Sequence, residues 1–212
     1  MAGFQFPHPD FAQSDGLLAI GGDLSSTTLI SAYSQGIFPW YDNSTPILWW
    51  SPDPRAIMQL DNIYISKRLA RTIRQGKFKT TINQDFRGVM EGCAHRPYEG
   101  TWITPEVIGA YQNLHSMGYA HSVEAWLGER LVGGIYGVSI GGLFAGESMF
   151  HTETDAGKVA LARLVEHLSA KGYELFDLQI LNDHTASLGA TEITRNDYLQ
   201  RLKMAIAKPV TF

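Results

Sequence analysis

The chain has 212 residues, 44% of them hydrophobic, and a formal net charge of −4 at pH 7. That length and hydrophobic content allow a buried core in one large domain or two small ones. The negative net charge argues against a surface covered with phosphate contacts, because nonspecific affinity for nucleic acid depends on Lys and Arg. Cys93 is the only cysteine, which excludes an internal disulfide and a zinc site built from several thiolates.

Membrane insertion and metal binding are not expected. The sequence has no run of eighteen apolar residues, and its first residues lack the basic and apolar regions of a signal peptide. We therefore expect a cytoplasmic protein with no membrane partner. The seven histidines are dispersed, and none is paired at helical spacing with another candidate ligand, so no metal site is expected.

The first sixty residues are rich in turn formers and aromatic residues, which predicts little regular structure. One helix is expected there. Ser25 or Ser26 can cap its start, Leu29 and Tyr33 belong to its apolar stripe, and Gly36 can end it.

The next segment concentrates positive charge. Six of the seventeen basic residues fall within thirteen positions, and no acidic residue lies between Asp61 and Asp85. On a helix, the first four would share one side while Leu69 and Ile73 face inward. This basic segment is either a solvated helix face or a phosphate-binding patch. Its members are Lys67, Arg68, Arg71, Arg74, Lys77 and Lys79.

The remaining sequence predicts an α+β fold, in which a helix packs on a mostly antiparallel sheet. Gly128–Arg130 and Gly141–Gly142 are typical of hairpin turns, so the three apolar runs around them predict an antiparallel meander. We expect a small N-terminal domain over residues 1–62 and a second domain over residues 63–212. The expected strands span residues 78–82, 121–127, 131–139, 143–150 and 175–180, and the expected helices residues 84–94, 104–116, 155–170 and 195–207.

Two polar segments lie where the apolar pattern predicts burial, and buried carboxylates are costly unless they are paired or used. Glu147 and Ser148 come near the end of the third meander strand. Asp177 and Gln179 alternate with apolar residues, so they should project from one face of a strand. These residues form either a structural hydrogen-bond pair or a reaction site.

A third cluster is aromatic and lies mostly in loops. It is either part of the core or a platform on which a nucleobase stacks. Its members are Trp40, Tyr41, Trp49, Trp50 and Trp102.

Six ordered blocks give the chain a specific resemblance. Over nearly its whole length it resembles the bacterial leucyl/phenylalanyl-tRNA-protein transferases. The blocks are Asp15–Leu24, Gly36–Tyr41, Leu48–Arg55, Gly100–Thr104, Gly146–Phe150, and Asp177–Gln179 followed by His184–Ala190.

The resemblance implies a small N-terminal domain followed by an acetyltransferase-like (GNAT-like) domain. It also implies an enzyme that moves Leu or Phe, and less readily Met, from leucyl-tRNA or phenylalanyl-tRNA to proteins beginning with Lys or Arg. The product carries an N-degron that marks it for degradation. No cofactor is implied, because the aminoacyl ester is already activated.

Residue roles follow from the same resemblance. Asp177, oriented by Gln179, would accept a proton from the attacking amine or hold that amine, and Glu147 would hold the substrate. Trp49 and Trp102 would flank the terminal adenosine, and the basic segment would hold the acceptor stem. The remaining expected substrate-binding residues are Ile135, Met149, Leu164 and Leu168, which would line the side-chain pocket, with Ser148 and Asn182.

Two other functions stay open on the sequence alone. The predicted second domain is also compatible with an acyl-CoA-dependent acyltransferase, since fold does not fix function. A non-catalytic tRNA-binding module would bind without transferring anything. We expect the transferase to be a monomer.

Overall fold

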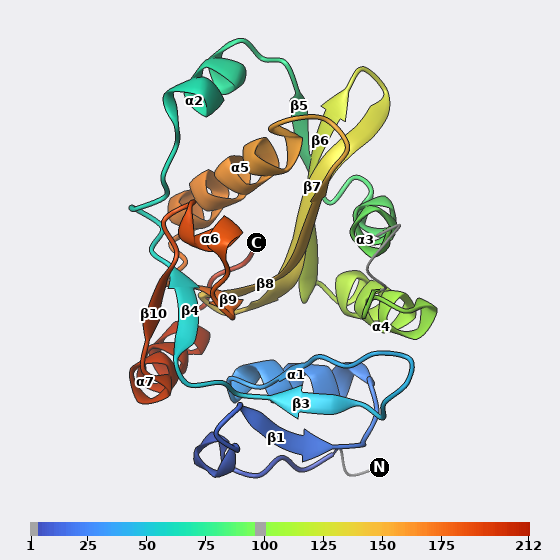
Figure 1. Cartoon of the computed structure of the whole chain (residues 1–212), viewed down its shortest axis with the longest axis vertical. Helices are drawn as coiled ribbons and strands as arrows, with labels where there is room; N and C mark the ends of the chain where they lie inside the picture. The colour runs from blue at the N-terminus through green and yellow to red at the C-terminus, as the bar shows by residue number, and fades with distance from the viewer. Residues whose placement is uncertain (1–3, 96–100) are drawn as a thin grey trace.

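The computed structural model describes residues 4–95 and 101–212. Gly100, the first residue of one family block, lies outside the described residues. Two sheets organise the chain: a three-stranded sheet in the order β1-β3-β2 and a seven-stranded sheet in the order β10-β4-β9-β8-β7-β6-β5. In Figure 1 the small sheet and α1 form a layer beneath the large sheet.

The small sheet consists of β1 (Leu17–Ile20), β2 (Phe38–Pro39) and β3 (Leu48–Trp50), all antiparallel. Helix α1 (Ser26–Ser34) packs beside it, and the Ser25 side chain caps it by accepting from the Thr28 amide, which confirms the predicted helix. The prediction of little other regular structure here is wrong. These strands have two to four residues, too few for an alternating pattern to appear in the sequence.

The large sheet is antiparallel except between β8 and β9, which run parallel. The α+β class, the mostly antiparallel sheet and the predicted meander of β6, β7 and β8 are therefore confirmed. The strands are β4 (Arg55–Met58), β5 (Lys79–Ile82), β6 (Ala120–Leu127), β7 (Arg130–Ile140), β8 (Leu143–His151), β9 (Leu175–Gln179) and β10 (Thr191–Ile193).

The domain boundary at residue 62 stays a prediction. Strand β4 precedes that residue but pairs with β9 and β10, so membership of the large sheet begins between β3 and β4.

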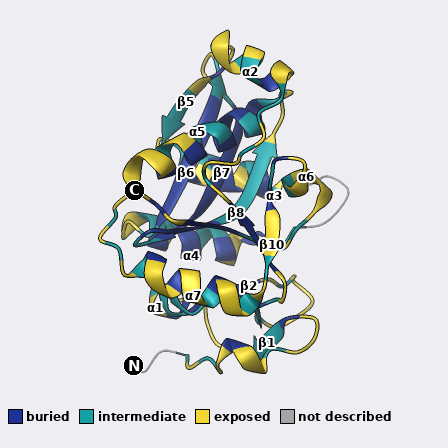
Figure 2. Ribbon diagram, turned by 90° about the vertical axis from the view of Figure 1, so that its left-hand side faces the viewer, coloured by how far each residue is buried: buried dark blue, intermediate teal, exposed yellow. Residues whose placement is uncertain are grey.

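Helices cover both faces of the large sheet. Helix α5 (Ala156–Lys171) lies on one face, and α3 (Phe86–Ala94) and α4 (Pro105–Ser116) lie on the other (Figure 1). The central strands are largely buried, whereas α2 (Lys67–Arg74) is largely exposed (Figure 2). Leu69 of α2 faces inward as predicted, but Ile73 is 41% exposed, contrary to the prediction. The short α6 (Asp183–Ala186) and α7 (Arg195–Ile206) complete the fold.

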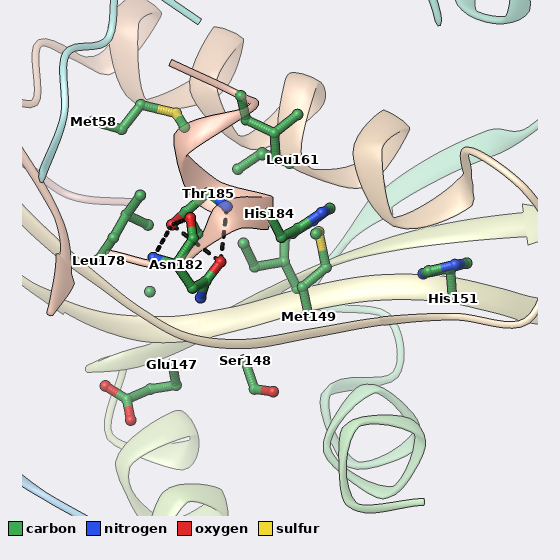
Figure 3. A pocket seen from close by; sticks show the side chains of 13 residues that line it. Met58, Glu147, Ser148, Met149, His151, Leu161, Leu178, Asn182, His184 and Thr185 are labelled. Atoms are coloured by element: carbon green, nitrogen blue, oxygen red, sulfur yellow. Dashed lines mark hydrogen bonds between the residues drawn. The ribbon is translucent and has the colours of Figure 1, made fainter. Parts of the chain in front are cut away.

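Two irregularities make an opening in the large sheet. Pairing between β8 and β9 stops at Ala145 and Asp177, although both strands continue. The β7–β8 register also skips Glu147, which is a β-bulge. Figure 3 shows the result: Glu147 and Ser148 point to the same side of β8, away from Met149.

In the described ranges, no helix is long and apolar enough to cross a lipid bilayer.

Candidate active site

Two pockets meet where β8 and β9 separate, and Figure 3 shows the larger one. The larger has a volume of about 330 Å³ and the smaller of about 260 Å³. Glu147, Leu178 and Asn182 line both, so the pockets share a boundary. The larger pocket is also lined by Met58, Ile135, Gly146, Ser148, Met149, His151, Leu161, His184, Thr185 and Leu188. The smaller is also lined by Phe38, Pro39, Trp40, Trp102, Gln179 and Ile180.

Glu147 is the carboxylate common to both pockets. Its Oε1 accepts hydrogen bonds from the Tyr33 hydroxyl and the Gln179 side-chain amide, each at 2.8 Å. Its Oε2 accepts from the Tyr111 hydroxyl at 3.3 Å. Burial, together with the nearby charge of Asp177, raises the pKa of Glu147 to about 7, against the lowering effect of these hydrogen bonds. Glu147 can therefore exchange a proton near neutral pH.

Asp177 has a different environment. It is 1% exposed, and its two oxygens accept from Nε and Nη2 of Arg55 at 2.9 and 2.7 Å. The Tyr198 hydroxyl also donates to Oδ2, and the Gln179 backbone N–H donates to Oδ1. Asp177 was predicted to accept a proton from the substrate amine, but in this geometry its carboxylate is enclosed by the protein's own donors.

Gln179 connects the two carboxylates. Its backbone donates to Asp177 and its side chain donates to Glu147. Its φ of +66° is uncommon for a residue with a side chain, and the regular alternation of β9 ends there. The structure thus brings the predicted trio together: Gln179 contacts Asp177 through its backbone N–H and Glu147 through its side-chain amide.

Trp49 does not occupy the position predicted for it. It is fully buried, its ring packs against Phe4 and Phe6, and its Nε1 donates to the Gly21 carbonyl. Enclosed in this way, Trp49 lines neither pocket, so the structure gives no support to the stacking role expected of it.

Trp102, the other tryptophan expected to flank the terminal adenosine, lines the smaller pocket. The second indole there belongs to Trp40, which is 46% exposed. The sequence places Trp40 in the aromatic cluster but indicates no specific role for it. Trp40 directly follows β2, a two-residue strand that the sequence pattern does not predict.

The predicted lining of the larger pocket is partly reproduced. Ile135, Met149, Ser148 and Asn182 line it. Leu164 and Leu168 do not. Both are fully buried in the core cluster between α5 and the sheet.

Leu161, one turn before Leu164, reaches the pocket instead. The helical period identifies which residues of α5 face the sheet, but not where along that face a cavity opens.

The basic segment lies on α2, the strand β5 and the turn between them. Arg68 donates to Asp155 at 2.7 Å, beside the start of α5, and Lys77 lies 4.0 Å from Glu153. These two members are therefore partly neutralised by acidic neighbours. The segment therefore lies near the N-terminal end of α5.

Four functional neighbours were not found by sequence reasoning. Arg55 has a signal in the sequence, because a charged residue at the start of a buried strand requires a partner of opposite charge. The three tyrosines have no comparable signal: each belongs to an apolar stripe, and only the fold brings their hydroxyls to a carboxylate. They are Tyr33, Tyr111 and Tyr198.

Comparison with known proteins identifies the family. Residues 57–203 match the family model for leucyl/phenylalanyl-tRNA protein transferase, and residues 22–53 match the model for its N-terminal domain. The chain belongs to the leucyl/phenylalanyl-tRNA-protein transferase family. As a member of this family it is a transferase whose substrates are an aminoacyl-tRNA and a protein, and the predicted family is confirmed.

Curated family members are similar over nearly the whole chain. The leucyl/phenylalanyl-tRNA–protein transferase of Anaeromyxobacter sp. (strain Fw109-5) is 52% identical over 207 residues, covering 96% of this chain and 88% of the relative. That of Syntrophotalea carbinolica is 50% identical over 209 residues, covering 97% and 91%.

Solved structures show more distant similarity. L-PGS from Bacillus licheniformis aligns with a TM-score of 0.43 and 16% identity, covering 75% of this chain and 54% of that one. A GCN5-related N-acetyltransferase from Kribbella flavida aligns with a TM-score of 0.42 and 11% identity, covering 78% and 59%.

Proposed function

We propose that this transferase moves Leu or Phe, and less readily Met, from its tRNA to the α-amino group of proteins beginning with Lys or Arg, creating an N-degron. The observation that carries this proposal is the meeting of an apolar pocket and an indole-lined pocket at one carboxylate, Glu147. An aminoacyl-adenosine has the matching parts: an apolar side chain, an ester and a base. The chain would act as a monomer in the cytoplasm.

The larger pocket suits an unbranched or γ-branched apolar side chain. Its wall combines flexible methionines with aliphatic side chains, and its polar side chains are those of Glu147, Ser148, His151, Asn182, His184 and Thr185. A β-branched Val or Ile would be rejected sterically. Such apolar differences amount to about 1 to 3 kcal/mol, so we expect preference rather than absolute exclusion.

The smaller pocket suits the terminal adenosine. Trp40 and Trp102 supply two aromatic surfaces there, and stacking on such surfaces tolerates any base. Sequence specificity for the tRNA is then not required from this pocket. Selection of the amino acid would come from the larger pocket alone.

We assign the proton-accepting role to Glu147. The α-amino nitrogen of the acceptor forms a bond to the ester carbonyl carbon, the bond to the ribose oxygen breaks, and that oxygen leaves with a proton. Glu147 accepts a proton from the attacking amine and can return it to the leaving ribose. Its pKa of about 7 suits both transfers at neutral pH.

Asp177 is assigned an indirect role, because its oxygens are enclosed by Arg55 and Tyr198. It would hold Gln179, whose amide in turn orients Glu147. Positioning can contribute as much as proton transfer to this aminolysis, since the leaving group is a ribose hydroxyl.

The basic segment would hold phosphates of the acceptor stem. Arg68 places α2 beside the start of α5, on the side of the sheet where the larger pocket opens. Few phosphates would be contacted, so the affinity should be modest and sensitive to salt.

The test is transfer of labelled Leu from leucyl-tRNA to a model protein with N-terminal Arg, without ATP. Valyl-tRNA and the same protein with N-terminal Ala serve as matched controls. We expect transfer of Leu and Phe to the Arg and Lys proteins and weak transfer in both controls. No transfer from leucyl-tRNA would overturn the proposed function, and equal transfer to N-terminal Ala would overturn the acceptor specificity.

A further inference from the structure

Arg55 makes an unusually complete set of contacts for a buried charge. It is 1% exposed, and its guanidinium binds both oxygens of Asp177 as a fork. The third nitrogen, Nη1, donates to the Gly36 carbonyl at 2.9 Å. The rings of Phe38 and Tyr198 lie 4.8 and 4.4 Å from the guanidinium carbon. A planar guanidinium can satisfy the fork, the carbonyl and the ring contacts together, and an ammonium cannot.

The fork reaches one wall of the smaller pocket. Asp177 Oδ1 accepts both from Arg55 and from the Gln179 backbone N–H. Gln179 lines the pocket and has a positive φ, a conformation that needs support from its surroundings. Fixing the Asp177 carboxylate therefore fixes the backbone that directs the Gln179 side chain toward Glu147.

The third nitrogen contacts the residue that precedes another part of the pocket lining. Gly36 ends the α1 region at a φ of +77°, and a Cβ there would lie 2.9 Å from side-chain atoms of both Tyr198 and Leu199. The next residues form β2 and continue to Trp40, which lines the pocket. Arg55 thus contacts the segment that carries Trp40 and the strand end that carries Gln179.

We propose that Arg55 is a positioning residue for the transfer reaction, which holds the end of β9, through Asp177, and the Gly36–Trp40 segment, through the Gly36 carbonyl, at the separation that forms the smaller pocket. The proposal rests on the function proposed above. In this role Arg55, a residue of β4, supports catalysis although it does not contact the substrate.

The first test is Arg55→Lys, which keeps the charge but loses the fork and the carbonyl contact. Arg163→Lys is the matched control, because Arg163 is half exposed and pairs with Glu166 on the outside of α5. We expect the Arg55→Lys protein to fold and its kcat to fall about 10- to 100-fold, because the site residues are displaced. The kcat of the Arg163→Lys control should equal that of wild type. Wild-type kcat in a folded Arg55→Lys protein would overturn the inference.

A control of reduced stability separates positioning from stability. Leu164→Ala removes a fully buried side chain from the core, outside the lining of both pockets, and should weaken the fold. If Arg55→Lys loses activity only because the fold is weaker, Leu164→Ala shows the same loss of kcat, and the inference fails. If Arg55 positions the site, Leu164→Ala keeps the wild-type kcat below its thermal transition, whereas Arg55→Lys does not.

The outcomes also separate this inference from the proposed function. Wild-type protein that transfers nothing from leucyl-tRNA contradicts the proposed function. Wild-type protein that transfers Leu, together with a fully active Arg55→Lys protein, contradicts the inference alone.

Discussion

The side-chain amide of Gln179 donates a 2.8 Å hydrogen bond to Oε1 of Glu147, between two strands that are no longer paired at that level. This contact holds the ends of β8 and β9 together across the boundary between the two pockets. Because Oε1 also accepts from Tyr33, Glu147 has a defined orientation while its Oε2 receives only the longer bond from Tyr111. Oε2 is therefore the oxygen better placed to receive a proton.

The rate of transfer should depend on the ionisation of Glu147. Its pKa is about 7, and only the carboxylate can accept a proton, so kcat should rise with pH through about 7. In Glu147→Gln this limb should disappear and kcat should fall about 10²-fold or more. Single-turnover rates from pH 5.5 to 8.5 measure both effects. A limb that persists unchanged in Glu147→Gln would assign it to the acceptor amine instead.

Glu147 should also impose a pH dependence on stability. Its folded-state pKa is raised from 4.5 to about 7, so its contribution is fully present below about pH 4.5 and is lost as pH rises through about 7. Relative to Glu147→Gln, wild type should lose on the order of 1 to 3 kcal/mol of unfolding free energy across that window. Urea unfolding of both proteins at pH 5 and pH 8 gives the difference. Parallel pH profiles would show that the folded and unfolded pKa values are alike.

The tryptophans should divide into two classes. Trp40→Ala and Trp102→Ala should each raise KM for leucyl-tRNA about tenfold, with little change in thermal stability, because stacking contributes about 1 to 3 kcal/mol per base. Trp49→Ala should instead cost about 3 to 5 kcal/mol of stability, since it empties a fully buried site. Thermal melts and KM measurements on the three proteins distinguish the classes. A large KM effect with unchanged stability for Trp49→Ala would contradict the assignment.

These two classes show what sequence reasoning could and could not resolve. The meander, α5 and the class of fold follow from periodicity, because long elements repeat their pattern over many residues. Trp40 and Trp49 both occur in short aromatic segments with no such repeat. Which indole is enclosed depends on the pairing of β3 with β1 and β2, a contact between distant residues.

The same limit applies to the two carboxylates. Alternation along β9 predicts that Asp177 is buried, and it is. This alternation does not indicate that Arg55, 122 positions earlier, neutralises Asp177. Nor does it indicate that a β-bulge turns Glu147 toward Tyr33 and Tyr111. The site residues could be selected from sequence, but their roles depend on partners from other elements.

Met149 should control the choice between Leu and Phe. Its side chain lines the larger pocket, so Met149→Ala enlarges the cavity and removes contacts that the smaller Leu depends on more. We expect the Leu-to-Phe ratio of kcat/KM to fall about tenfold. Leu164→Ala is the control. It should cost about 2 to 5 kcal/mol of stability without changing that ratio, because Leu164 lies in the core and outside the pocket lining.

The basic segment should act through phosphate contacts, and its members should differ. Arg71 and Arg74 lie in the last turn of α2, whereas Arg68 is already bound to Asp155. Arg71→Ala and Arg74→Ala should each weaken tRNA binding and reduce the slope of log Kd against log salt by about one. Arg68→Ala should give a smaller change, since Asp155 offsets its charge. Binding of uncharged tRNA at several salt concentrations, with Arg163→Ala as a control on the outside of α5, measures the slopes. Equal slopes in all variants would remove α2 from the tRNA-binding surface and place the acceptor stem elsewhere, while leaving the assignments of Glu147 and Trp40 intact.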